Sequence, residues 1–111
     1  MTPSRLPAAL EVSGLIRLVE ASGGFAMVLR KGEPDSGTLL IVLLDNQGLG
    51  QAFERLPQVD GTRRWSISKR QDIENKQDFE NYLTRRMAQD PDMWVIELTI
   101  ADGERLILNQ D

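Results

Sequence analysis

One short turn gathers most of the side chains that could do chemistry. Between two apolar runs, the segment 31–37 reads Lys-Gly-Glu-Pro-Asp-Ser-Gly, which places Lys31, Glu33, Asp35 and Ser36 close together. Loops that carry functional groups between rigid strands have this make-up. Tight turns need the same residue types, because Pro, Asp, Ser and Gly each suit turn geometry. The segment is therefore both a candidate contact surface and an ordinary structural turn.

The two carboxylates of this turn raise the question of a magnesium-dependent enzyme, since Mg²⁺ prefers carboxylate oxygens. Restriction-endonuclease-like enzymes place an acid near a Pro-Asp pair, then an acid and a lysine two residues apart on the next strand. Asp35 could be the first acid, but the later segments 45–47 and 54–56 supply no lysine. Such motif matches are weak without the full spacing. We therefore predict no catalytic residue, no metal ligand and no cofactor.

A second candidate is the basic segment 63–70. Its cations, with Trp65 among them, could hold phosphates and stack a base. Alternation argues against this use, since Trp65 and Ile67 share one face and are expected in the core. Charges on such a strand also discourage unwanted edge pairing. The cations of the segment are Arg63, Arg64, Lys69 and Arg70, and two more follow at the end of the next predicted helix, Arg85 and Arg86.

Two further segments carry polar groups or glycines. Asp90 and Asp92 could bind a cation, but Pro91 between them is typical of a helix end. The segment 48–50, Gly-Leu-Gly, lacks the third glycine of a dinucleotide-binding loop, because Phe53 stands at that place. Neither segment indicates a specific reaction or ligand.

The composition removes most enzyme classes. The 111 residues include no histidine and no cysteine, which excludes the commonest general base, thiol nucleophiles, thiolate metal sites and disulfides. The net charge of −4 does not favour a nucleic-acid partner. We find no signal peptide and no apolar run long enough to cross a bilayer, so we expect a cytoplasmic protein without a membrane partner.

The elements that position these residues follow from hydrophobic spacing. A helix is predicted over 8–22, because Val12, Leu15, Ile16 and Val19 fall on one helical stripe. The apolar runs 25–29 and 38–44 do not alternate. We therefore expect them to form a hairpin that is buried on both faces at the centre of the domain.

The rest of the chain continues the pattern of grouped strands. We predict strands over 49–56, nearer an edge, and over 63–68, half exposed, and then a polar loop over 69–75. A second helix is expected over 77–89, a strand over 93–100, a hairpin turn at 102–103 and a final strand over 105–108. The chain is thus predicted to be a single α+β domain, residues 1–111. Its mostly antiparallel sheet has the order α-β-β-β-(β)-α-β-β, with two helices packed on the sheet.

Several blocks in this order resemble a family of small alphaproteobacterial proteins, the domain of unknown function 1491 family. The similar blocks, together with the first predicted helix, are Arg5-Leu6-Pro7, Val28–Gly37, Asp60–Trp65 and Asp90–Glu97. They span nearly the whole chain. The resemblance implies a bacterial, cytoplasmic protein, and it implies no activity, cofactor or catalytic residue.

We therefore predict a non-enzymatic protein that acts by protein–protein contact or by self-association as a homodimer. Its binding surface would be an open strand edge or the face near residues 69–77. The candidate contact surface comprises Lys31, Glu33, Asp35, Arg63, Arg64, Lys69 and Arg70. Two alternatives stay open: nucleic-acid binding through the basic segment, and a magnesium-dependent, nuclease-like enzyme that uses Glu33 and Asp35.

Overall fold

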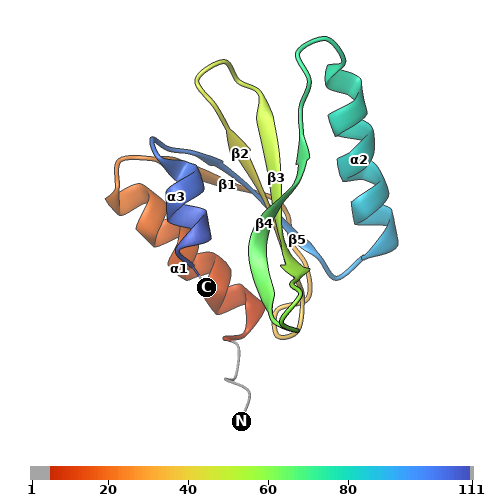
Figure 1. The fold of residues 1–111 in the computed structure, drawn as a ribbon. Helices are drawn as coiled ribbons and strands as arrows, with labels where there is room; N and C mark the ends of the chain where they lie inside the picture. Colours follow the sequence, from red (N-terminus) through yellow and green to blue (C-terminus); the bar gives the residue numbers. More distant parts are fainter. Residues whose placement is uncertain (1–5, 111) are drawn as a thin grey trace.

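A five-stranded sheet organises the computed structural model, which describes residues 6–110 (Figure 1). Three helices pack on this sheet, so the fold is α+β, as predicted. The elements in chain order are α1 (Ala8–Ala21), β1 (Phe25–Arg30), β2 (Leu39–Leu44), β3 (Gly50–Pro57), β4 (Arg63–Arg70), α2 (Lys76–Gln89), β5 (Trp94–Thr99) and α3 (Gly103–Leu108). No helix in the described part of the chain is long and apolar enough to cross a membrane.

The strand order is β1-β5-β2-β3-β4, and the parallel pair is β5 with β2. All the other neighbouring pairs are antiparallel. The predicted hairpin of the first two strands is therefore wrong, because β5 lies between them: Ile96 is opposite Val28 on one side and Ile41 on the other. Local sequence could not show this, since β5 arrives from a distant part of the chain.

The two apolar runs also differ in burial. Strand β2 is central, and all its residues but Leu44 are buried, as predicted. Strand β1 lies at an edge of the sheet, and its residues alternate between exposed and half-buried. Its lack of sequence alternation therefore does not mean burial on both faces. Apolar side chains stand on a face of β1 that the described elements leave open.

Two core clusters lie on opposite faces of the sheet, as the flanking helices in Figure 1 show. Helices α1 and α3 cover one face, where Val12, Val19, Ile107 and Trp94 are buried. Helix α2 covers the other face, where Phe79 and Leu83 lie against strands β2, β3 and β5. The predicted apolar stripe of α1 is confirmed, and so is the predicted second helix. Strand β2 contributes to both clusters, and all its residues but Leu44 are buried.

The end of the chain differs from the prediction. Residues 103–108 form the helix α3 rather than a final strand, so three helices and not two lie on the sheet. The adjacent residues Leu106 and Ile107 both pack against the α1-side cluster. Neighbouring residues of a strand point to opposite faces, so this shared contact requires a helical turn. The turn before it is tight, with Asp102 in the left-handed region at φ 55°.

Strand β4 is longer than predicted and reaches Arg70. Lys69 and Arg70 are consequently strand residues, and the predicted polar loop is reduced to a short turn before α2. A bulge between Ala52 and Phe53 in β3 adjusts the register of this edge pair. The position of β4 at the sheet edge agrees with the predicted half-exposed strand.

Ile96 should be the most sensitive aliphatic position of the sheet, because it is fully buried in the strand that joins β1 to β2. We expect Ile96→Ala to lower the free energy of unfolding by about 4 kcal/mol through lost burial and a cavity. The exposed Leu18 of α1 is the control, and Leu18→Ala should change stability by only about 0.5 kcal/mol. Urea denaturation measures both. Equal losses would contradict the central role of β5.

Candidate functional site

The candidate turn 31–37 is hydrogen-bonded to the start of helix α1. The backbone carbonyl of Asp35 accepts a hydrogen bond from Ala8 N at 3.1 Å, and that of Pro34 accepts one from Ala9 N at 2.8 Å. These carbonyls satisfy donors of the first turn of α1, where the N-cap residue Pro7 provides no side-chain cap. The turn therefore completes the N-terminus of a helix.

The Glu33 carboxylate is occupied within the same turn. Its Oε2 accepts hydrogen bonds from Asp35 N at 2.9 Å, from the backbone N of Ser36, and from Ser36 Oγ at 2.9 Å. The bond from the Ser36 backbone contributes most to lowering the pKa of Glu33. In the described part of the chain, no three acidic side chains stand close enough together to hold a metal ion. The arrangement favours turn stabilisation over metal chemistry.

The turn also rests directly on the start of β5. Glu33 N donates to the Asp92 carbonyl at 2.9 Å, and Trp94 Nε1 donates to the Glu33 carbonyl at 2.9 Å. A Cβ at Gly32 would lie only 2.1 Å from the Asp92 carbonyl oxygen. Glycine is thus required by close backbone contact. Lys31 and Asp35 remain exposed beside this fixed segment.

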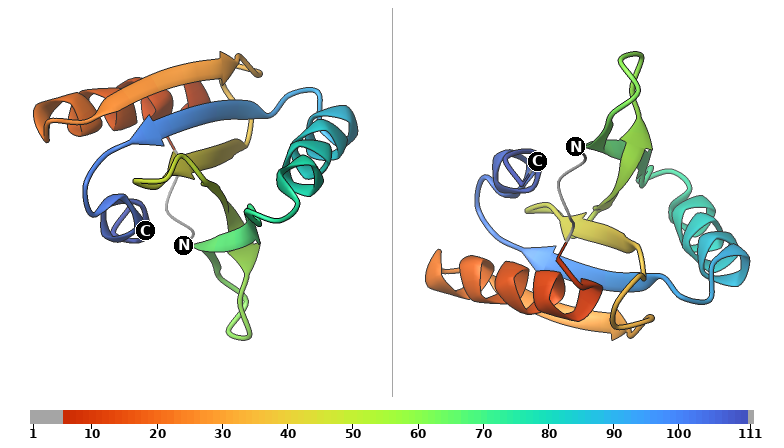
Figure 2. Two further views of the ribbon diagram at one scale, coloured as in Figure 1. Left: turned by 90° about the horizontal axis from the view of Figure 1, so that it is seen from above. Right: turned by 90° about the horizontal axis from the view of Figure 1, so that it is seen from below.

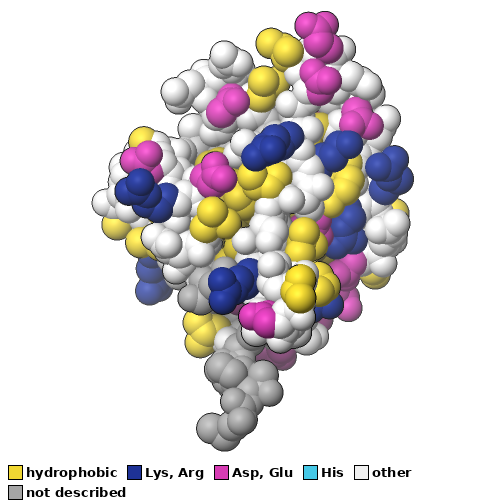
Figure 3. All heavy atoms as spheres, in the orientation of Figure 1, with side chains coloured by type: hydrophobic (Ala, Val, Ile, Leu, Met, Phe, Trp, Pro, Cys, Tyr) yellow, Lys and Arg dark blue, Asp and Glu magenta, His cyan; other side chains and the backbone are white. Residues whose placement is uncertain are grey.

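The basic segment does not present its cations as one group. Lys69 forms an ion pair with Asp78 of α2 at 2.7 Å, and Arg63 donates to the Arg55 carbonyl at 3.3 Å. Arg64 and Arg70 are exposed towards opposite ends of β4. The face that carries β4 shows Lys and Arg interspersed with acidic and apolar side chains, without a continuous basic patch (Figure 3).

Trp65 belongs to the core, as predicted. Its exposed fraction is 4%, and the Arg55 guanidinium lies 4.4 Å from its ring centroid. Arg55 in turn pairs with Glu11 of α1. The indole is therefore enclosed between strand and helix and is not presented for base stacking. Ile67, on the same face, packs against the same cluster.

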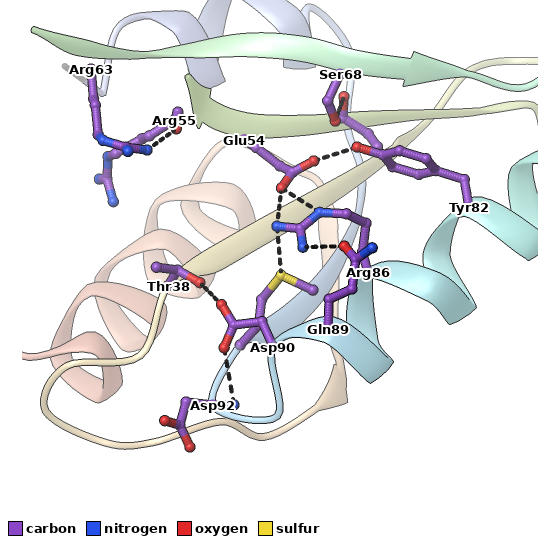
Figure 4. Close-up of polar contacts among 12 residues, drawn as sticks. Thr38, Glu54, Arg55, Arg63, Ser68, Tyr82, Arg86, Gln89, Asp90 and Asp92 are labelled. Atoms are coloured by element: carbon purple, nitrogen blue, oxygen red, sulfur yellow. Dashed lines mark hydrogen bonds and ion pairs between the residues drawn. The ribbon is translucent and has the colours of Figure 1, made fainter. Parts of the chain in front are cut away.

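A buried polar cluster, which the sequence analysis did not identify as a site, joins β3 to α2 (Figure 4). Glu54 is 7% exposed, and its Oε1 accepts hydrogen bonds from Arg86 Nη2 at 2.6 Å and Nε at 3.0 Å. Its Oε2 accepts a hydrogen bond from the Tyr82 hydroxyl at 2.6 Å. The sequence shows that Tyr82 and Arg86 are one helical turn apart on α2, but it does not show which acid they contact.

The charges in this cluster balance one another. Burial alone would raise the pKa of Glu54, but the hydrogen bonds from Arg86 and Tyr82 outweigh it, so the pKa is lowered. Burial and the Glu54 contact raise the pKa of Tyr82, and the bond to Glu54 raises the pKa of Arg86. All three groups are engaged with one another. The cluster is suited to fixing α2 on the sheet rather than to proton transfer.

The strongest feature of the surface is the edge strand β1. It is the first strand of the sheet, with α1 alongside it, and no strand of residues 6–110 pairs with its outer side (Figure 2). Phe25, Met27 and Leu29 have exposed fractions of 59%, 45% and 47%. The intervening Ala26 and Val28 pack against the α1-side cluster. The strand therefore combines an unpaired backbone edge with exposed apolar side chains.

The end of β1 is tied to α2. A register shift between Val28 and Arg30 turns the Arg30 side chain towards the end of α2. Its guanidinium donates to the Met87 carbonyl at 2.9 Å and to the Asp90 carbonyl at 3.2 Å. A cation at these carbonyls complements the negative end of the helix. The only charge of β1 is thus engaged internally, and residues 25–29 carry none.

The contact at Gly32 gives a direct test of the structural role of the turn. Gly32→Ala should destabilise the protein by about 2 kcal/mol or more, because backbone must move away from the new methyl group. Gly14→Ala is the matched control, since nothing lies within 4 Å of its Cβ position, and it should stabilise α1 by about 0.8 kcal/mol. Thermal and urea unfolding would show the opposite signs. A stabilising Gly32→Ala would contradict the described turn.

The ion pair of Glu54 and Arg86 predicts a change in pH dependence. Arg86→Met should lower the free energy of unfolding at pH 7 by about 3 kcal/mol, because it leaves a buried carboxylate without a cation. The exposed neighbour Arg85 provides the control, and Arg85→Met should cost about 0.5 kcal/mol or less.

The sign of the pH effect separates the two variants. In the native protein, the lowered pKa of Glu54 stabilises the fold above the ordinary value of 4.5, and this stabilisation is lost as the pH falls through the folded pKa. In Arg86→Met, burial dominates and raises this pKa, so stability should fall as the pH rises above about 4.5. Unfolding between pH 3 and 8 measures both slopes. Parallel curves for the native and Arg86→Met proteins would contradict the ion pair.

Comparison with known proteins identifies the relationship of the chain. Residues 6–108 match the model of DUF1491, described as a protein of unknown function. A crystal structure of a DUF1491 family protein from Caulobacter crescentus is 33% identical and covers 86% of this chain and 88% of that chain, with a TM-score of 0.73. An NMR structure of a Caulobacter crescentus DUF1491 protein is 34% identical, covers 91% of both chains and has the same TM-score, 0.73.

A third similar structure comes from A. tumefaciens. It is 28% identical over 88% of each chain, with a TM-score of 0.70. No curated protein sequence gives a match. The family model covers the two core clusters, the turn 31–37 and the edge strand β1 together, and the predicted family resemblance is confirmed. This chain belongs to the DUF1491 family of proteins of unknown function, with alphaproteobacterial relatives.

Proposed function

We propose that this protein is a non-enzymatic contact module that binds a protein partner through the edge strand β1. The single observation that carries this proposal is the uncharged, unpaired edge with Phe25, Met27 and Leu29 exposed. Exposed strand edges bind other strands readily, because their free N–H and C=O groups form a template. The absence of cysteine from the sequence fits action in a reducing compartment such as the cytoplasm.

The intramolecular hydrogen bonds of several acidic side chains support a non-catalytic role. Glu33 is hydrogen-bonded within its turn, and Glu54 is enclosed by Tyr82 and Arg86. Asp90 accepts a hydrogen bond from Thr38 Oγ1 at 3.0 Å. These carboxylates serve as structural acceptors, so a magnesium-dependent reaction at Glu33 and Asp35 has less support than contact through β1.

The opposite edge of the sheet is better protected. Strand β4 carries cations at both of its ends, and charges on an edge strand are a common way to prevent edge pairing. Two of the cations proposed for nucleic-acid binding, Lys69 and Arg86, are held in ion pairs. A nucleic-acid partner would therefore depend on the remaining cations, which are Arg63, Arg64, Arg70 and Arg85. We treat that partner as an outcome of the test below.

Site-specific photo-crosslinking tests the contact function. A benzoylphenylalanine at Met27 should crosslink to a protein in an alphaproteobacterial extract, whereas the same group at Ile73 should not. Ile73 is a suitable control because it is also apolar, 62% exposed and lies outside β1. The captured protein is then purified. It should bind the native chain and Ile73→Lys equally, and Met27→Lys at least about tenfold more weakly.

Other results would overturn the proposal. Equal crosslinking from Met27 and Ile73, or equal binding of the two lysine variants, would show that β1 is not the contact surface. Salt-sensitive capture of nucleic acid, lost in Arg64→Glu with Arg70→Glu, would favour the nucleic-acid alternative instead. Circular dichroism of each variant confirms that it is folded before binding is compared.

A further inference from the structure

We infer that the strand bound at β1 is the β1 strand of a second copy of this chain, paired antiparallel about a two-fold axis at Met27. This inference rests on the proposed contact function and narrows it to one occupant. A two-fold axis is the commonest symmetry of protein dimers, and it joins identical surfaces. The pairing would extend the five-stranded sheet across both copies.

The sequence of β1 is suited to this pairing. With Met27 opposite Met27 of the partner subunit, Ala26 would lie opposite the partner's Val28. Phe25 would lie beside the partner's Leu29, where the register shift of β1 begins. Directly opposed residues of antiparallel strands point to the same face. The exposed side chains of Phe25 and Met27 would therefore meet those of the second copy on one face. Ala26 and Val28 would meet their counterparts on the α1 side.

The charges at the two ends of β1 favour the antiparallel direction. The C-terminal end leads into Arg30 and the exposed Lys31, while the N-terminal end follows the last turn of α1 with the exposed Glu20. That last turn has no basic residue, and the carbonyls of a helix C-terminus attract a cation. Antiparallel pairing brings the partner's Lys31 towards Glu20. Parallel pairing would bring like charges together at each end.

Helix α1 supplies further surface on the same side. Ala9 and Ile16 pack against the same cluster as Ala26 and Val28 of β1, and Ser13 continues their helical stripe. Small side chains at Ala9 and Ser13 would permit the two copies of α1 to approach each other beneath the joined sheet. The helix contact adds area to a strand pair that alone is small compared with the roughly 1,600 Å² of a standard interface.

Cysteine crosslinking tests the register, and the absence of native cysteine makes each introduced thiol unique. Opposed residues of an antiparallel pair have Cα atoms about 4.5–5.5 Å apart, within the range for a disulfide. Met27→Cys should therefore form a disulfide-linked dimer on mild oxidation at micromolar concentration. Phe25→Cys should crosslink to Leu29→Cys in a mixture more than either does to itself. Ile73→Cys is the control and should stay monomeric on a non-reducing gel.

Sedimentation equilibrium tests the same contact without a covalent bond. The native chain and Ile73→Lys should show equal dimer dissociation constants. Met27→Lys should weaken the dimer at least about tenfold, because two ammonium groups would face each other across the axis. Circular dichroism and thermal unfolding show whether the variant keeps its fold, and Met27→Thr provides a second, uncharged variant that should weaken the dimer less.

The outcomes separate this inference from the contact function. A monomeric native chain at all concentrations, with Met27→Cys crosslinking no more than Ile73→Cys, would overturn self-pairing. If Met27 then still captures a different protein, contact through β1 stands with another occupant. If it captures nothing specific, both proposals fail. A dimer that Met27→Lys leaves unchanged would place the contact elsewhere and would also overturn the inference.

Discussion

The insertion of β5 between β1 and β2 is the constraint on which the rest of the structure depends. One face of β5 buries Trp94, Ile96 and Leu98 beneath α1 and α3, and the other buries Val95 beneath α2. The start of β5 holds the turn 31–37, through Asp92 just before the strand and Trp94 as its first residue. Both core clusters and the N-terminal cap of α1 thus require β5 in place. The edge position of β1 follows from the same insertion.

The sequence predicted the helices and strands better than it predicted which strands lie side by side. The hydrophobic spacing of α1, the continuous apolar run of β2 and the range of α2 were all read correctly from local sequence. The predicted pairing of β1 with β2 was wrong because strand partners are chosen by contacts between distant residues. The segment 105–108, predicted as a strand, is too short for its period to distinguish a strand from a helix. Only the joint contact of Leu106 and Ile107 with the core decides it.

In the candidate site, too, contacts between residues far apart in the sequence could not be predicted. The residue types at 31–37 correctly predicted a turn. In the structure, the Glu33 carboxylate stabilises this turn by hydrogen bonds. Glu54 was invisible as a site because Arg86 and Tyr82 come from a helix much further along the chain. The exposure of β1 was equally hidden, since an apolar run has the same composition at the centre of a sheet and at its edge. Strand order, rather than composition, makes β1 a surface.

The cap of α1 has a consequence for the order in which the chain folds. The carbonyls of Pro34 and Asp35 complete the first turn of this helix, yet their loop rests on Asp92 and Trp94 near the other end of the sequence. During synthesis, the N-terminal helix leaves the ribosome long before β5 exists. Until then, the loop that caps the first turn of α1 lacks its hydrogen bonds to Asp92 and Trp94. The complete cap of α1 therefore depends on contacts with β5, although the two elements are far apart in the sequence.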